Sequence, residues 1–402
     1  MSTDERHSGM GSVATEALGR FGGLQFREVE IANGAQSIRR RAILEIIGRS
    51  LEPRRIVALK HQQFGERGIP FTPVDWYGSV WYMGDPRILV PGVDYPRTFQ
   101  EVDEWFRSDA ACHEYIRRLR WPDGFICPGC QWTGEPRVTL RGLFQCRSCQ
   151  RQTSVTAGTI FQDTRKPLRT WFMAMWYVIN QKNGVSALGL QRVLGFSSYE
   201  TAWTWLHKLR RAMVRPGRDS LCGTVEVDET YVGGVEKGKH GREILTKAIV
   251  AVAAEERGKG IGRIRLRRIN DVSGASLLPF VQSAAVPGAL IHTDGWGGYS
   301  GLTAAGYKHE VTVVSASPDP AHVVMPRVHN IAALLKRWLL GTHQGGVQHI
   351  HLDYYLDEFT FRFNRRQSKA RGLLFHRLAH QAVSIGPATY NTIVGKPTVD
   401  RE

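Results

Sequence analysis

Apolar side chains recur at helical spacing through the middle of the chain. Between residues 167 and 214 they fall at positions i, i+3, i+4, i+7 and i+8, which places them on one face of a helix. The stripe consists of Leu168, Trp171, Phe172, Met175 and Trp176. A buried helical region is therefore predicted here.

The second half of this region has the pattern of two short helices joined by a turn. Gly195 lies in the turn, Ser198 is placed to cap the next helix, and that helix runs to about Arg211. We assign residues 165–215 as a helix-turn-helix-like DNA-binding region, with Lys208, Arg210 and Arg211 as DNA contacts. An ordinary helical hairpin is the alternative.

After residue 223 the pattern changes to the alternation of strands, interrupted by helices. Strands are predicted at 224–231, 247–254, 261–269, 289–293 and 310–314, and helices at 273–284, 328–340 and 351–365. Three strands in succession, followed by alternating helices and strands, describe an α/β domain over residues 223–366. Its sheet is expected to be mixed, with an antiparallel start.

The remaining segments have weaker patterns. Residues 1–87 form an N-terminal extension without an assigned role, residues 88–124 a helical segment, and residues 367–402 a C-terminal tail.

Charge narrows the choice of partner. The 402 residues carry 53 Lys and Arg against 37 Asp and Glu, a net charge of +16, which favours a polyanion such as nucleic acid. No apolar run approaches the roughly 18 residues that span a bilayer, so no membrane partner is expected. The first ten residues are polar, which argues against a secretory signal and for a cytoplasmic protein.

Four of the six cysteines have the spacing of a metal site. Cys127 and Cys130 form one C-x2-C pair and Cys146 and Cys149 a second, with 15 residues between the pairs. Four thiolates would complete the tetrahedral shell of a structural Zn²⁺ and leave no position for a reacting water. We place a zinc ribbon at residues 125–157. Two disulfides are the alternative, which a non-secreted chain disfavours.

Two aspartates are candidates for chemistry. Asp228 lies within the first strand of the α/β domain, where aspartate is disfavoured, and Asp294 follows the fourth strand. If these strands are neighbours, the two carboxylates converge and can share Mg²⁺, the cation that suits such oxygen ligands. A pair of such ions could activate water and stabilise the leaving oxygen of a phosphodiester. The alternative for Asp294 is that it only begins an Asp-Gly turn.

A histidine and a lysine on the following helix could complete the site. His329 and Lys336 are seven residues apart, close to two helical turns, so they share a face. Lys336 could then point toward a phosphate. A solvated basic helix face is the alternative.

Taken in order, these motifs resemble those of bacterial insertion-sequence transposases of the DDE type with an N-terminal zinc ribbon and an ISXO2-like transposase domain. The matching stretches are the cysteine pairs, the helix-turn-helix pattern, and the segments Val225-Glu-Val-Asp-Glu-Thr-Tyr-Val-Gly-Gly234, Ile291-His-Thr-Asp-Gly-Trp-Gly-Gly-Tyr299, Leu334-Leu-Lys-Arg337 and Tyr355-Leu-Asp-Glu-Phe-Thr-Phe-Arg-Phe-Asn-Arg-Arg366. The resemblance covers roughly residues 88–385.

This resemblance implies a ribonuclease-H-like catalytic fold in which Asp228 and Asp294 are the first two members of an acidic triad. His329 falls at the third position, where many members of the family have Glu or Asn. Mg²⁺ prefers oxygen ligands, so His329 could instead orient water or contact phosphate, or this copy could be impaired. Glu358 is a possible substitute acid, although it could simply be a surface charge.

The sequence thus predicts a DNA transposase. The zinc ribbon and the helix-turn-helix-like region would bind terminal inverted repeats, with Lys336 and Arg337 as further DNA contacts. The catalytic domain would perform Mg²⁺-dependent hydrolysis and strand transfer into target DNA, as a homo-oligomer associated with the nucleoid. Two rivals are a DNA-binding regulator or domesticated copy with an inactive nuclease-like domain, and a nuclease without strand transfer.

Overall fold

The computed structural model describes residues 89–215, 217–234, 247–313 and 316–395, and three strands nearer the N-terminus. The chain divides into two units, Met1–Pro86 and Arg87–Glu402. In the first unit, β1 (Ala14–Phe21) pairs antiparallel with β2 (Leu24–Asn33), which pairs with β3 (Gln36–Ser37). The sequence analysis predicted none of these strands.

The second unit contains a five-stranded mixed sheet, in agreement with the predicted α/β class. Its strands are β7 (Thr224–Val232), β8 (Ala248–Arg257), β9 (Gly260–Ile269), β10 (Leu290–Thr293) and β11 (Lys308–Val311). Their order is β11-β10-β7-β8-β9. Strand β8 runs antiparallel to both of its neighbours, β7 and β9. Strand β10 runs parallel to β7, and β11 runs parallel to β10.

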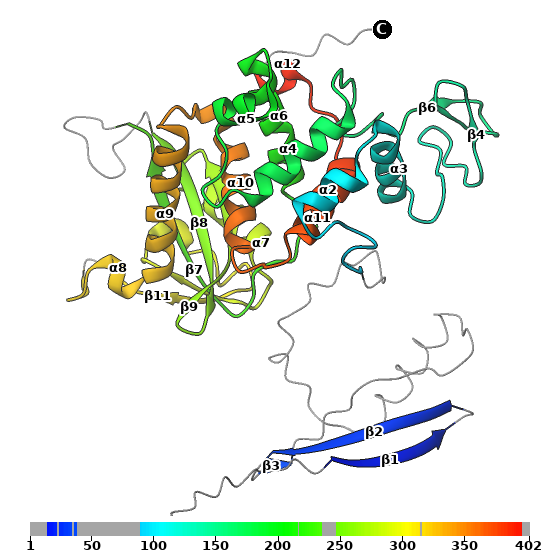
Figure 1. Ribbon diagram of the computed structural model, residues 1–402. Coiled ribbons are helices and arrows are strands. Elements are labelled where there is room, and N and C mark those ends of the chain that lie inside the picture. Colours follow the sequence, from blue (N-terminus) through cyan, green and yellow to red (C-terminus); the bar gives the residue numbers. More distant parts are fainter. Residues whose placement is uncertain are drawn as a thin grey trace, which may run out of the picture. The chain divides into compact units, whose positions relative to one another are not determined.

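Helices cover both faces of this sheet (Figure 1). Because side chains alternate along a strand, Val225 and Val227 pack on one face with α7 (Gly274–Ala284). The opposite face carries the even-numbered residues of β7 and packs against α9 (Pro326–His343) and α10 (Leu352–Asn364). As predicted, α10 contributes its apolar stripe to this core, namely Leu352, Tyr355, Leu356, Phe359 and Phe363.

A separate core holds the helical region that precedes the sheet. Its helices are α2 (Phe99–Trp105), α3 (Asp109–Arg120), α4 (Leu168–Asn180), α5 (Ala187–Leu194), α6 (Tyr199–Ala212) and α11 (Arg371–Ser384). The predicted stripe of α4 is buried in it, from Leu168 to Trp176. Phe106 meets Phe172 edge to face there, with ring centroids 4.5 Å apart.

Helix α11 shows that residues 371–384 are not a peripheral tail. Leu374, Phe375 and Leu378 lie in the helical core. The helix approaches the chain near Pro96 so closely that a Cβ on Gly372 would lie 1.7 Å from the Pro96 carbonyl oxygen, so only glycine fits at this position.

The remaining elements are short. They are β4 (Arg137–Val138), β5 (Phe144–Gln145), β6 (Gln152–Thr153), η2 (Gly297–Tyr299), α8 (Ala321–Val324), η4 (His349–His351) and α12 (Tyr390–Ile393). Within the described residues, no helix has both the length and the apolar composition needed to cross a membrane.

A buried histidine makes stability sensitive to acid. His207 on α6 is fully buried, and neither ring nitrogen has a hydrogen-bond partner in the part of the chain that the structure describes. Burial, reinforced by the charge of Arg210, lowers the pKa of His207 to about 2. The folded protein keeps this ring neutral, whereas the unfolded chain takes up a proton below about pH 6.5, so stability falls as pH falls.

We predict that His207→Leu removes this part of the acid sensitivity. Between pH 7 and pH 5.5, the free energy of unfolding should fall by about 1 kcal/mol less in the variant than in the wild type. Urea denaturation at both pH values measures the difference. His349→Leu is the control, because His349 is exposed and its ring meets water in both states. Equal acid losses in His207→Leu and the wild type would contradict the prediction.

Candidate functional site

The sheet brings the two predicted aspartates to one place. In the parallel pairing of β10 with β7, Leu290 lies opposite Thr224 and His292 opposite Glu226. Continuing this register by two residues places Asp294 opposite Asp228. The two strands are therefore neighbours, which is the condition that the sequence analysis set. Both aspartates continue the even-numbered positions, so their side chains lie on the sheet face that packs against α9.

Backbone N–H groups hold both carboxylates. The Glu229 N–H donates to Asp228 Oδ1 at 2.8 Å, and the Trp296 N–H donates to Asp294 Oδ1 at 3.0 Å. The second bond closes a turn at Gly295, whose φ of +83° favours glycine. Asp294 therefore does begin an Asp-Gly turn, and the turn also fixes its carboxylate at the end of the strand.

Helix α9 adds the predicted histidine and lysine to the same site. His329 Nε2 lies 3.8 Å from Asp228 Oδ2. Partial burial, followed by the charge of His322, lowers the pKa of His329, while Asp294 acts in the opposite direction. Burial also lowers the pKa of Lys336, which is close enough to Asp228 to be influenced by its charge. Asp228, Asp294, His329 and Lys336 thus form one electrostatic cluster.

A third carboxylate fixes the helix that carries His329. Glu226 is fully buried and accepts hydrogen bonds from the backbone N–H groups of Arg327 at 2.8 Å and Val328 at 3.0 Å. The Arg327 guanidinium donates to its other oxygen at 2.6 Å. The sequence analysis placed no role on Glu226. Its one sequence signal is that it shares a strand face with Asp228.

Only some of the side chains in this cluster are suitable ligands for a hard divalent cation. Two aspartate carboxylates are ligands that Mg²⁺ prefers, whereas the imidazole of His329 is a softer ligand. Asp228 and Asp294 are therefore the residues that could hold Mg²⁺. His329 is better suited to a contact with water or phosphate.

Four cysteines form the second site. Their sulfur atoms all lie within 4.8 Å of one another, with Cys127 Sγ 3.6 Å from Cys149 Sγ and Cys130 Sγ 3.6 Å from Cys146 Sγ. Tetrahedral zinc with Zn–S bonds near 2.3 Å requires sulfur atoms about 3.8 Å apart. None of the four forms a disulfide. The arrangement fits a structural Zn²⁺.

The two cysteine turns are built alike. The Cys127 N–H donates to the Trp132 carbonyl at 2.9 Å, and the Cys146 N–H donates to the Arg151 carbonyl at 2.9 Å. A hydrogen bond from the Cys130 backbone N–H lowers the pKa of the Cys127 thiol to about 6, which favours the thiolate that binds metal. Each turn thus fixes its first cysteine through a backbone hydrogen bond of its own, and both of these cysteines are also buried in the helical core.

Comparisons with known proteins match the two regions in which these sites lie. Residues 220–364, which contain Asp228, Asp294 and His329, match the family described as ISXO2-like transposase domain. Residues 107–152, which contain all four cysteines, match the family described as transposase zinc-ribbon domain. These two stretches are similar to parts of insertion-sequence transposases. The resemblance inferred from the motifs is therefore confirmed.

Part of the chain is also similar to a curated protein. An uncharacterized protein in transposable element ISH50 of Halobacterium salinarum is 30% identical over 137 residues, or 33% of this chain. The match covers 45% of the relative, so the chain spans less than half of that protein's length.

The two helices of the predicted helix-turn-helix-like segment are α5 and α6. Gly195 ends α5 in the left-handed conformation at φ +63°, and the Ser198 side chain caps α6 by accepting from the Glu200 N–H. Helix α6 packs against α5, α10 and α11, so its exposed residues are confined to its first turn, at Tyr199 and Glu200.

The predicted DNA contacts separate into three groups. Lys336 and Arg337 are exposed on α9, and Lys208 and Arg211 are partly buried on α6. Arg210 must be removed from the set, because it is 1% exposed and donates from Nε to Glu358 at 2.7 Å. A guanidinium enclosed in this way has no access to a DNA phosphate.

Glu358 is likewise neither a surface charge nor a substitute acid. It is fully buried, and its two oxygens accept from Arg210 and from Arg362, the latter at 2.7 Å. Burial would raise the pKa of Glu358, but the two guanidinium groups outweigh it and lower the pKa to about 2. Both oxygens are engaged in the core, which leaves this carboxylate no part in the cluster around Asp228.

The zinc ribbon yields a first prediction. Chelation of zinc should unfold residues 125–157 locally, because the bonds from four cysteine sulfurs to the cation supply folding free energy that so small a module loses without it. Trp121 packs against ribbon residues Phe125 and Phe144, with ring centroids at 4.9 and 5.3 Å, so its fluorescence should change when a chelator is added. The control is Cys222→Ser, which removes a cysteine outside the cluster and should preserve the response. An unchanged spectrum with full loss of zinc would refute a structural role.

Glu358 yields a second prediction. Glu358→Gln should lower the free energy of unfolding by about 3 kcal/mol, because it leaves two buried guanidinium groups without a countercharge. The exposed Glu114→Gln, which removes a surface pair with Arg117, should cost less than about 1 kcal/mol. Urea denaturation compares the two. A catalytic acid without a structural role would instead leave stability unchanged.

Proposed function

We propose that this chain is a DNA transposase that cleaves and joins DNA at the ends of its element. The observation that carries the proposal is the sheet register that sets Asp228 opposite Asp294, with His329 Nε2 3.8 Å from Asp228. Three antiparallel strands followed by two parallel ones, in the order β11-β10-β7-β8-β9, support a ribonuclease-H-like catalytic fold. We assign residues 223–366 to this catalytic domain.

Each residue of the cluster has a role in this proposal. Asp228 and Asp294 would hold Mg²⁺, which would supply activation of water and stabilisation of the leaving oxygen of a phosphodiester. His329, whose lowered pKa favours the neutral ring, positions water or accepts a hydrogen bond from it. The Lys336 ammonium lies on the same side and attracts the phosphate. Hydrolysis frees a 3′-hydroxyl, which then attacks target DNA.

The other parts of the chain bind DNA in this proposal. A net charge of +16 favours DNA, and the zinc ribbon with the helix-turn-helix-like region 165–215 recognises the terminal inverted repeats. Exposed Lys336 and Arg337, with the partly buried Lys208 and Arg211, contact the DNA backbone. Two ends must be held at once, so the active form is a homo-oligomer on DNA at the nucleoid.

A second candidate is a DNA-binding regulator or domesticated copy whose nuclease-like domain is inactive. The observation that favours it is the imidazole of His329, which approaches Asp228 where many relatives have an oxygen ligand. A nuclease without strand transfer is distinguished from a transposase by the absence of joined products. One assay separates all three, because it records binding, nicking and joining of the same DNA.

We predict that Asp228→Asn and Asp294→Asn each reduce Mg²⁺-dependent cleavage of end-containing DNA by about 10³-fold, because each removes a charged ligand. DNA affinity in a gel-shift assay should remain within about twofold of the wild type. The exposed Asp123→Asn is the matched control and should keep full activity. Full cleavage by either site variant would refute the assignment, and a wild type that binds but never nicks would favour the regulator.

A further inference from the structure

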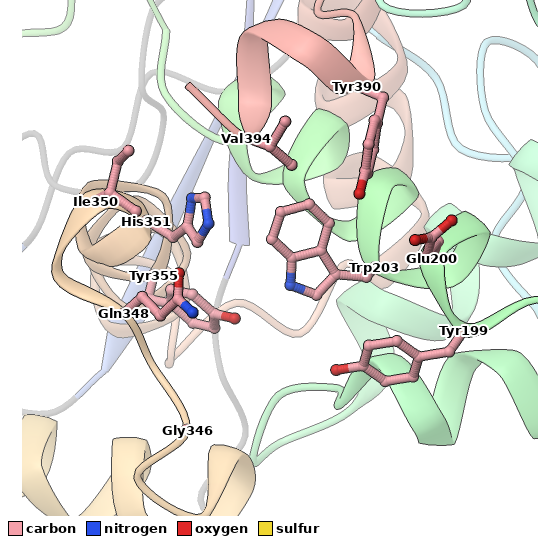
Figure 2. A pocket seen from close by; sticks show the side chains of 10 residues that line it. All are labelled: Tyr199, Glu200, Trp203, Gly346, Gln348, Ile350, His351, Tyr355, Tyr390 and Val394. Carbon is pink, nitrogen blue, oxygen red and sulfur yellow. The ribbon is translucent and has the colours of Figure 1, made fainter. Parts of the chain in front are cut away.

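A pocket of about 510 Å³ lies beside the first turn of α6, outside the aspartate cluster. Its walls come from α6, from the segment between α9 and α10, from α10 itself and from α12, so distant parts of the sequence build it (Figure 2). The aromatic and polar side chains that line it include Tyr199, Glu200, Trp203, Gln348, His351 and Tyr390.

The aromatic rings surround this space without stacking on one another. Trp203 meets His351 edge to face at 5.0 Å and 76°, and meets Tyr390 at 6.4 Å and 71° (Figure 2). Tyr199 is 52% exposed and Tyr390 is 40% exposed. Exposed aromatic side chains gathered around one pocket are characteristic of binding sites. Tyr199 and Tyr390 therefore offer exposed ring surface to a planar ligand.

Polar groups at this pocket retain unused hydrogen-bonding capacity. His351 is only 8% exposed, and its Nδ1 finds no partner among the residues that the structure describes. Glu200 and Gln348 line the same space, and the structure gives neither side chain an internal hydrogen bond among the described residues. Glu200 and Gln348 thus offer polar atoms to a ligand, whereas the enclosed Nδ1 of His351 leaves one buried nitrogen unpaired in the pocket wall.

The carboxylate of Glu200 selects the chemistry of that ligand. A negative side chain repels DNA phosphates, so the phosphate backbone would stay outside. The same carboxylate accepts hydrogen bonds from an exocyclic amino group such as N4 of cytosine. Aromatic side chains stack on any base, because every base has a π face.

We propose that this pocket binds one unpaired nucleobase that carries an exocyclic amino group. Trp203 and Tyr390 hold the ring, and Glu200 accepts from the amino group. The first turn of the second helix in a helix-turn-helix is also where bases are contacted. The inference rests on the proposed function in so far as DNA is the ligand.

The test measures single-stranded binding by the full, zinc-loaded chain and needs no cleavage. The probes are fluorescent oligonucleotides of about ten nucleotides: oligo(dC), oligo(dU) and an abasic strand of equal length. Cytosine and uracil share size and stacking and differ at the amino group. Fluorescence anisotropy should show oligo(dC) binding about tenfold more tightly than the abasic strand and about fivefold more tightly than oligo(dU).

Variants assign these preferences to the pocket. Trp203→Ala should weaken oligo(dC) binding about tenfold while affinity for the abasic strand stays unchanged. Tyr390→Ala removes a second aromatic ring of the pocket, from α12, and should also weaken oligo(dC) binding. It provides the test if Trp203→Ala does not fold. Glu200→Gln should remove the preference for oligo(dC) over oligo(dU) and keep the preference over the abasic strand. Phe99→Ala is the matched control, because Phe99 is 55% exposed and lies outside the pocket.

Several results would overturn the proposal. Equal affinity for oligo(dC) and the abasic strand would do so, as would equal effects of Tyr390→Ala and Phe99→Ala. A change of oligomeric mass in Tyr390→Ala, without an effect on oligonucleotides, would identify a protein-docking site instead. Cleavage of duplex ends without a base preference would overturn the pocket and leave the proposed function intact. A base preference without cleavage would support the pocket and count against transposase activity.

Discussion

The buried carboxylate of Glu226 is the constraint on which the candidate active site depends. A charge that is fully removed from water needs strong partners, and Glu226 finds them in the first backbone N–H groups of α9 and the guanidinium of Arg327. The helix N-terminus, which carries partial positive charge, is thereby tied to β7. His329 follows Val328 directly, so the bond from the Val328 N–H to Glu226 also fixes the approach of His329 to Asp228.

A second buried carboxylate connects the helical region to the sheet. Glu358 on α10 is paired with Arg210 on α6, and Arg362 on α10 donates to the carbonyl groups of Val178 and Gln181 near the end of α4. From the same helix, Asn364 bonds the Ile264 backbone of β9 through both of its amide atoms, at 2.8 and 3.1 Å. Helix α10 therefore cannot move away from α6 or β9 without leaving buried polar groups unpaired. The helices assigned to DNA and the sheet assigned to catalysis share one rigid connection.

The sequence predicted those features that depend on local patterns. Alternation located the five strands. Adjacency of β7 and β10 was the condition on which a shared site of Asp228 and Asp294 was predicted, and the sheet order meets it. Arg210 was misjudged because its burial depends on Glu358, 148 positions away, and no local pattern marks such a pair. Helix α11 was missed because polar residues interrupt its apolar stripe. One of them, His376, is buried and bonds the Tyr115 hydroxyl at 2.9 Å.

The histidine at position 329 changes the electrostatics of the site as well as its ligands. A glutamate there would add a third negative charge beside Asp228 and Asp294, and mutual repulsion would make the cluster depend on a cation. A neutral imidazole adds no charge, and burial keeps the pKa of His329 low. The cluster is therefore less repulsive without metal and attracts a divalent cation less strongly than a cluster of three acids. The positive charge of Lys336, which Asp228 influences from the same site, would lower that attraction further.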